Sequence, residues 1–151
     1  MPTSCSLCER IQLSEDPLVI RRSSHSLLYH MPGIDLPGYL VVAPLRHVEH
    51  AGMLEDAELA DLARLQATAT KTILELSGVR RVYTLSFGEV LPHLHIHLFP
   101  RTDVMVDDPG SLHEGVADGP RLFDRWRKRL AISAPSAQVA ELVERMKKRS
   151  V

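Results

Sequence analysis

The 151-residue sequence contains little cysteine and no excess of charge of either sign. Its two cysteines are too few for the disulfide framework of a small secreted domain. Lys and Arg (18) nearly balance Asp and Glu (19), which excludes a global field that would recruit nucleic acid or an anionic membrane. Any anionic ligand must therefore be held by a local site, and we expect neither a nucleic-acid nor a membrane partner.

Long hydrophobic runs are also missing. No apolar stretch approaches about 18 residues, the length of a membrane-spanning helix, and the first residues lack the basic and apolar segments of a signal peptide. With the low cysteine content, this predicts a cytoplasmic protein in a reducing compartment. The length and a hydrophobic content of 44% fit a single domain with a real core.

Local patterns predict an antiparallel sheet with one long helix packed on it. The β-rich runs at 17–22 and 25–30 indicate a hairpin, and the run at 38–44 is apolar on both faces, as is typical of a central strand. Between 56 and 77, the spacing of apolar residues predicts a helix with one apolar stripe. The stripe comprises Leu59, Leu62, Leu65, Ala69, Ile73 and Leu76.

The last third of the chain is predicted to be a loop followed by two helices. Residues 103–120 hold several Gly, Asp and Pro residues without a steady period, which predicts a loop. Amphipathic helices are expected at about 122–130 and 139–146. Trp126, on the first of them, is interpreted as a core residue, and stacking on a bound base is the alternative.

Three histidines alternate with apolar residues in the run from 92 to 101: His93, His95 and His97. A strand at 80–87 and a turn at Gly88 are expected to precede them. Because successive side chains of a strand point to opposite faces, the three imidazoles would line one face while their apolar neighbours face the core. Imidazole can attack, donate a hydrogen bond or bind a metal near pH 7. The alternatives are an unremarkable polar face and a metal cage built from all three.

This motif resembles the signature of the histidine triad (HIT) family of nucleotide hydrolases and transferases, His-x-His-x-His followed by two apolar residues. The segment from Gly38 to Val48 is similar to the family's glycine, apolar strand, proline and histidine, and the long helix follows. The resemblance covers about residues 5–101. It implies an α+β, HIT-like fold: an antiparallel sheet of about five strands with one long helix packed on it.

From the length of the chain we expect one HIT domain over residues 1–151, of which the resemblance covers the core. Beyond its core at about 5–101, we expect a loop at about 102–120 and a C-terminal helical extension at about 121–149. Family members are usually homodimers, so a homodimer is expected here too.

The activity that the resemblance implies is chemistry at the α-phosphate of a nucleotide. His95 would attack phosphorus and form a covalent nucleotidyl-histidine intermediate. His97 would stabilise the charge on the non-bridging oxygens. The implied substrates are dinucleoside polyphosphates, such as diadenosine tetraphosphate, or nucleoside phosphoramidates. The competing hypothesis is a nucleotide- or partner-binding module with little turnover.

A metal site is also implied, because Cys5 and Cys8 are similar to the N-terminal pair of the zinc-bearing branch of the family. That branch implies four zinc ligands, which here are Cys5, Cys8, His47 and His93. Two thiolates and two imidazoles close a tetrahedral structural site and leave the other two triad histidines free for chemistry. His50 is the rival of His47, and a lone Cys-x-x-Cys also fits a redox pair or two buried thiols. No organic cofactor is expected.

The sequence departs from the family pattern at three positions that bear on the substrate. Glu89 stands where the family often has glutamine, and an ionised carboxylate there would repel a triphosphate. The family's ribose-binding acid corresponds to Met31, which leaves Asp35 as the nearest acidic candidate for substrate binding. Tyr39 replaces the frequent histidine after Gly38. These departures predict a divergent branch with its own leaving-group preference.

Overall fold

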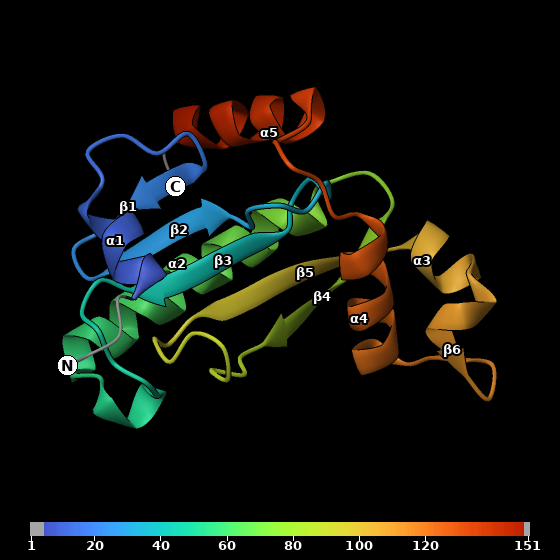
Figure 1. Ribbon diagram of the computed structural model, residues 1–151, viewed down its shortest axis with the longest axis horizontal. Helices are drawn as coiled ribbons and strands as arrows, with labels where there is room; N and C mark the ends of the chain where they lie inside the picture. The colour runs from blue at the N-terminus through green and yellow to red at the C-terminus, as the bar shows by residue number, and fades with distance from the viewer. Residues whose placement is uncertain (1–4, 150–151) are drawn as a thin grey trace.

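The computed structural model describes residues 5–149, and a sheet of five antiparallel strands lies at its centre (Figure 1). The strands are ordered β1-β2-β3-β5-β4 across the sheet. Their bounds are Val19–Arg22 for β1, Ser26–His30 for β2, Leu40–Pro44 for β3, Val79–Leu85 for β4 and Ile96–Thr102 for β5. The α+β class and the five-stranded antiparallel sheet predicted from the sequence are therefore confirmed.

Helix α2 (Asp56–Leu74) packs along one face of the sheet, behind the strands in Figure 1. At its start the Glu58 carboxylate accepts a hydrogen bond from the Glu55 backbone N–H at 2.8 Å, which satisfies a donor that the helix leaves free. Leu59, in the first turn, is 48% exposed. The buried part of the predicted stripe therefore begins one turn later than expected and comprises Leu62, Leu65, Ala69 and Ile73.

The opposite face of the sheet is covered at two ends by different helices. Helix α1 (Ser6–Gln12) buries Leu7 against Tyr29 and Val41 of the neighbouring strands β2 and β3. Helix α4 (Gly119–Arg129) buries apolar side chains against Tyr39 and Phe99. The apolar side chains of α4 in this second cluster are Leu122, Phe123 and Trp126.

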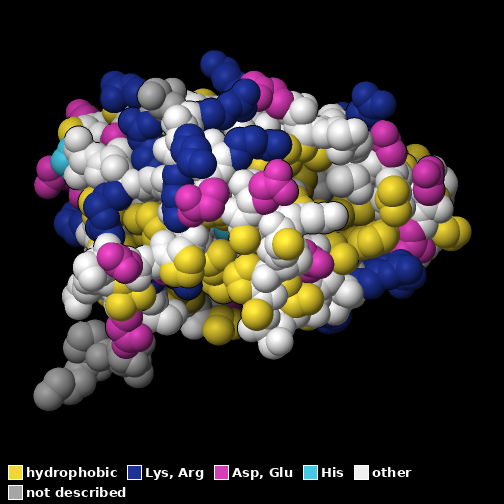
Figure 2. All heavy atoms as spheres, turned by 90° about the horizontal axis from the view of Figure 1, so that it is seen from above, with side chains coloured by type: hydrophobic (Ala, Val, Ile, Leu, Met, Phe, Trp, Pro, Cys, Tyr) yellow, Lys and Arg dark blue, Asp and Glu magenta, His cyan; other side chains and the backbone are white. Residues whose placement is uncertain are grey.

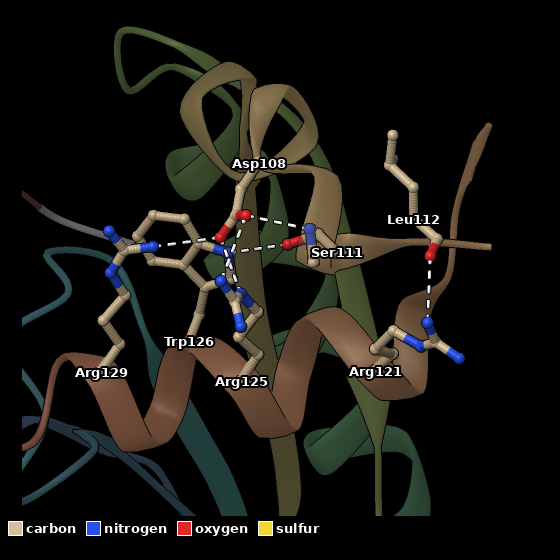
Figure 3. A network of polar contacts seen from close by, with 8 residues as sticks. Asp108, Ser111, Leu112, Arg121, Arg125, Trp126 and Arg129 are labelled. Carbon is tan, nitrogen blue, oxygen red and sulfur yellow. Dashed lines mark hydrogen bonds and ion pairs between the residues drawn. The ribbon is translucent and has the colours of Figure 1, made fainter.

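The segment from 103 to 118, for which the sequence predicts a loop, is largely folded. It forms the helix α3 (Asp103–Asp107), the 3-10 turn η2 (Pro109–Ser111) and a small hairpin of β6 (Leu112–His113) and β7 (Val116–Ala117). Side chains of α4 hold this segment in place. Asp108 accepts hydrogen bonds from Arg125 at 2.7 Å and Arg129 at 3.0 Å, and the Trp126 indole donates to the Ser111 hydroxyl at 3.0 Å (Figure 3). Because these partners are 15 or more residues away, no local pattern reveals them.

The last helix, α5 (Ala137–Lys148), joins α2 in the core on the other face of the sheet. Ser136 caps it by accepting a hydrogen bond from the Val139 backbone N–H at 3.3 Å. The two predicted C-terminal helices are thus present, and Trp126 is 8% exposed, as predicted for a core residue. A 3-10 turn, η1 (Ala51–Met53), precedes α2.

The distribution of charged side chains on the surface agrees with the balanced charge of the sequence. Figure 2, which views the molecule from the side of α5, shows basic and acidic side chains close together. Lys147 pairs with Glu144 at 2.7 Å, and Arg149 pairs with Glu75 at 2.6 Å. None of the helices within residues 5–149 combines the length and the apolar character needed to cross a membrane.

Candidate active site and metal centre

The three histidines lie where the chain enters β5, and only His97 belongs to the strand itself. The predicted strand through all three is therefore wrong at its start. The Leu94 backbone N–H donates to the Val48 carbonyl at 2.6 Å, and the pairing of β5 with β3 begins only at Ile96. The alternation of sides still holds, because the intervening apolar residues face the α2 core while the imidazoles face α1 and α4.

His95 is held by a carbonyl group of its own segment. Its Nδ1 lies 2.6 Å from the backbone oxygen of His93. A carbonyl oxygen can only accept a hydrogen bond, so Nδ1 carries the proton of the neutral ring. The lone pair is then on Nε2, the nitrogen suited to nucleophilic attack.

His97 lies beside His95, with 5.0 Å between the ring centroids, and is only 6% exposed. Its Nδ1 lies 2.9 Å from the hydroxyl of Tyr39. Burial lowers the pKa of His97 to about 4, and the positive charge of Arg127, together with that of His95 when its ring is protonated, acts in the same direction. At neutral pH this imidazole is therefore uncharged and can serve as a neutral hydrogen-bond donor.

A cleft of about 210 Å³ opens beside these two histidines. Arg10 is the only residue with a formal charge among the described residues that line it. Its guanidinium stacks on the Tyr29 ring at 5.0 Å and pairs with the Asp16 carboxylate. The complete lining consists of Ser6, Leu7, Arg10, Tyr29, Met31, Pro32, Leu91, His95 and His97. The arrangement offers a potential nucleophile, a neutral donor and one cation to a ligand with an apolar portion.

The two acidic residues predicted to bind substrate do not line this cleft. Glu89 is exposed in the turn between β4 and β5. Asp35 accepts a hydrogen bond from the Ser136 hydroxyl, and its backbone N–H donates to the Leu130 carbonyl at 2.7 Å. Asp35 is thus bound to the connection between α4 and α5, whereas Met31 lines the cleft. The prediction that Asp35 or Glu89 contacts the substrate therefore stays a prediction, and the positions of these two residues outside the cleft do not favour it.

The four predicted metal ligands come together at the other end of the histidine segment. The candidate ligand atoms of Cys5, Cys8, His47 and His93 all lie within 4.8 Å of one another. His47 Nδ1 is 3.3 Å from Cys8 Sγ, and His93 Nδ1 is 3.5 Å from both sulfurs. His50, the rival of His47, is exposed and lies outside this group.

The chemistry of this cluster fits a tetrahedral zinc ion. Zn–S and Zn–N bonds of about 2.3 and 2.0 Å place neighbouring ligand atoms roughly 3.5 Å apart, close to the distances found here. His93 Nε2 lies 3.0 Å from the Pro44 carbonyl, which requires the proton on Nε2 and leaves the Nδ1 lone pair facing the sulfurs. A backbone carbonyl in this position is the usual orienting partner of a metal-bound histidine.

Two residues of the site, Tyr39 and Arg10, were not predicted from the sequence. Tyr39 was recognised only as a departure from the family pattern, and Arg10 was not considered. The position of Tyr39 directly after Gly38 was a visible signal, but its bond to His97 spans 58 residues along the chain. Arg10 follows Cys8 on α1, so the metal-ligand prediction itself could have directed attention to it.

The chain is similar to known proteins in its family signature and in its fold. A family model described as the HIT domain matches residues 14–104. The fold is similar to that of a HIT-family protein from Bacillus subtilis, with a TM-score of 0.60, 18% identity and coverage of 87% of this chain and 100% of that one.

Two further solved structures share the fold. One is the histidine triad nucleotide-binding protein from Candida albicans, with a TM-score of 0.57, 17% identity and coverage of 66% of this chain and 76% of that one. The other is the diadenosine triphosphate hydrolase from Plasmodium falciparum, with a TM-score of 0.54, 20% identity and coverage of 59% and 64%. Since the HIT model also spans more than half of the sequence, the chain belongs to the HIT family.

Proposed function

We propose that this protein cleaves nucleoside phosphate derivatives at the α-phosphate, through a covalent nucleotidyl intermediate on His95. The observation that carries this proposal is the 2.6 Å contact between His95 Nδ1 and the His93 carbonyl, which leaves the Nε2 lone pair free in a ring that lines a cleft. The proposed substrates are dinucleoside polyphosphates, such as diadenosine tetraphosphate, or nucleoside phosphoramidates. Names of relatives support this class, since one is a diadenosine triphosphate hydrolase and another a nucleotide-binding protein.

The reaction proceeds in two displacements. In the first, His95 Nε2 forms a bond to phosphorus while the bond from phosphorus to the leaving group breaks. The leaving group departs with that electron pair, as a phosphate anion or, from a phosphoramidate, as an amine that takes up a proton from water. Positive charge then develops on the His95 ring, and the His93 carbonyl stabilises it through the Nδ1–H bond. In the second, water attacks phosphorus, the P–N bond breaks, and a nucleoside monophosphate and a proton are released.

His97 acts as a hydrogen-bond donor in both steps. A donor aimed at a non-bridging phosphate oxygen becomes more effective as negative charge shifts onto that oxygen. Because His97 is neutral at physiological pH, it can supply this bond without placing a second full charge beside His95. We assign it stabilisation of the transition state.

Arg10 is the one formally charged residue among the described residues that line the cleft, and its positive charge suits a substrate that carries phosphate. The rest of the lining is mostly apolar and suits the base or the leaving group. Asp35 and Glu89 could contact only a substrate that extends beyond the cleft.

We further propose that Cys5, Cys8, His47 and His93 hold a structural Zn²⁺ ion. When bound, zinc would supply cross-linking rather than catalysis, because four protein ligands leave no open position. The cluster joins α1 to the histidine segment and thereby supports the cleft wall that contains Arg10.

Assembly and location are part of the same proposal. We infer a homodimer, as is usual in the family, that acts on small-molecule nucleotides in the cytoplasm. The outer edge of β4 makes no strand pairing within residues 5–149, which leaves it available for a second copy. A reducing compartment would keep both thiols available to the metal.

Intact-protein mass spectrometry tests the proposed chemistry. The protein is mixed briefly with adenosine and guanosine polyphosphates and phosphoramidates, alongside His95→Ala and His113→Ala. His113 is exposed on β6 and does not line the cleft, so its variant is the matched control. A nucleotidyl adduct is expected on the wild type and on His113→Ala only.

Two other outcomes would contradict the proposal. An adduct on His95→Ala would show that another group is the nucleophile. If no compound gave an adduct or a released monophosphate, while nucleotides still bound, the competing hypothesis of a binding module with little turnover would be favoured.

A further inference from the structure

Tyr39 makes a buried contact with the active-site pair that the mechanism above does not use. Its hydroxyl oxygen lies 2.9 Å from His97 Nδ1, and the side chain has no exposed surface. The rings of Phe99 and Phe123 pack around it, with centroids 5.1 and 6.2 Å away. The hydroxyl group is therefore held in one place, in surroundings with little access for water.

The direction of this hydrogen bond follows from the partners that each group has. Within residues 5–149, His97 Nδ1 is the one hydrogen-bonding partner of the Tyr39 hydroxyl. If Nδ1–H were the donor, the Tyr39 O–H would be buried without an acceptor, which is costly. If Tyr39 donates, the hydroxyl proton and the Nδ1 lone pair are both satisfied. Burial also raises the pKa of Tyr39, so the hydroxyl keeps its proton.

His95 shows the opposite arrangement only two residues away. Its Nδ1 faces a carbonyl oxygen and must carry the proton, so its Nε2 is the free lone pair. His97 Nδ1 faces a hydroxyl donor, so a neutral His97 carries its proton on Nε2. That Nε2 makes no hydrogen bond within the described part of the chain.

We propose that Tyr39 is a positioning residue that holds His97 in the Nε2–H tautomer, so that the pair presents one acceptor and one donor to the ligand. The tautomer assignment stands on the contact alone, whereas its catalytic use rests on the proposed function. The donor is needed for bonding to a phosphate oxygen. The opposite tautomer would place a second lone pair against that oxygen and repel it.

Nitrogen-15 NMR of the zinc-loaded wild-type protein, near pH 7.5, tests the assignment directly, because the two ring nitrogens of a neutral imidazole differ strongly in chemical shift when only one is protonated. We expect His97 as Nε2–H and His95 as Nδ1–H in the same spectrum. A His97 that carries its proton on Nδ1 would overturn the proposal. This measurement needs neither turnover nor a variant that folds.

Tyr39→Phe then tests the cause. We expect His97 to become a mixture of tautomers while His95 stays as it is, and kcat to fall about tenfold with little change in KM, the size expected for one neutral hydrogen bond. Tyr83→Phe is the matched control, since its ring packs against the same cluster and its hydroxyl makes no hydrogen bond within the described residues. It should leave both the His97 spectrum and kcat unchanged.

Each remaining outcome decides part of the inference. An unchanged His97 tautomer in Tyr39→Phe would overturn the role of Tyr39. A changed tautomer with an unchanged kcat would overturn its catalytic use. A wild type without turnover would contradict the proposed function but not the tautomer assignment.

Discussion

The Cys/His cluster and the cleft share one histidine segment but use imidazole in opposite ways. In the cluster, His93 directs Nε2 at the Pro44 carbonyl and leaves Nδ1 for the cysteine sulfurs. In the cleft, His95 directs Nδ1 at a carbonyl and leaves Nε2 for the ligand. The backbone partner, rather than the residue type, therefore decides whether a triad histidine is suited to a metal or to phosphorus.

The two regions should also differ in what they contribute. The cluster ties α1 to a segment that lies 85 to 88 residues further along the chain, so its main contribution should be to stability. The cleft contains the group proposed to react, so changes there should alter chemistry or ligand binding. Three further experiments test whether the two regions differ in this way.

Removing the metal should have the largest effect, and it should act on stability. If the folded protein binds zinc far more tightly than the unfolded chain does, chelation removes about 4 kcal/mol at a thousandfold excess of free metal over Kd. For a protein of this size that lowers the Tm by about 10 °C. Differential scanning calorimetry with and without a chelator measures it, and Cys8→Ser should show a low Tm that no longer responds to the chelator.

The division would fail if the chelator left the Tm unchanged. A second result would also contradict it. If turnover, measured well below the lowered Tm, stopped when the metal was removed and resumed when it was restored, with no change in the amount of folded protein, the metal would be needed for more than stability. That result would place the metal in the chemistry.

Acid should destabilise the protein through the cleft, by a smaller amount. The pKa of His97 is about 4 in the folded protein, mainly because of burial and also because of His95 and Arg127, whereas an unfolded histidine has a pKa of about 6.5. Below pH 6.5 the unfolded chain takes up a proton that folded His97 does not. The stabilisation is therefore complete above pH 6.5 and is lost as the pH falls to about 4, by roughly 1–3 kcal/mol.

Urea unfolding at several pH values measures this loss, with His97→Gln as the comparison. Burial also lowers the pKa of His30, which adds to the loss in both proteins. The variant should therefore keep part of the pH dependence and lose the share that belongs to His97. Identical curves for the two proteins would contradict the prediction.

The smallest effect is expected for Arg10→Gln, at the point where the two regions meet. Arg10 lies on α1, whose first turn contains Cys8, and lines the cleft beside His95 and His97. The substitution removes one charge-assisted hydrogen bond to the substrate, and Asp16 already partly neutralises the charge of Arg10. We therefore expect KM to rise about 3- to 10-fold while kcat stays nearly unchanged.

Arg121→Gln is the control for this change, because Arg121 is exposed and donates to the Leu112 carbonyl, outside the cleft lining. It should leave steady-state KM as in the wild type. An Arg10→Gln variant with an unchanged KM would show that Arg10 serves only its ion pair with Asp16.

Local periodicity was sufficient to predict most of the secondary structure. The strands around 19–30 and 40–44, helix α2 and the two C-terminal helices all show their pattern within a short window of sequence. The segment at 103–118 could not be predicted in this way, because Asp108 and Ser111 are held by side chains of α4. The start of β5 was misplaced for a similar reason, since the Leu94 backbone N–H donates to the Val48 carbonyl, which lies outside the strands of the sheet.

By itself, the sequence determined the fold class, the histidine motif and the four residues that gather as candidate metal ligands, since each depends on spacing along the chain or on resemblance to a family. Which ring nitrogen His93 and His97 offer became clear only from the folded molecule, because their orienting groups, the Pro44 carbonyl and the Tyr39 hydroxyl, come from distant parts of the chain. The tertiary structure also brought Arg10 to the cleft and bound Asp35 to Ser136. Hydrogen bonds act over about 3 Å in space, whatever the separation in sequence, and this is why these roles could not be predicted from spacing.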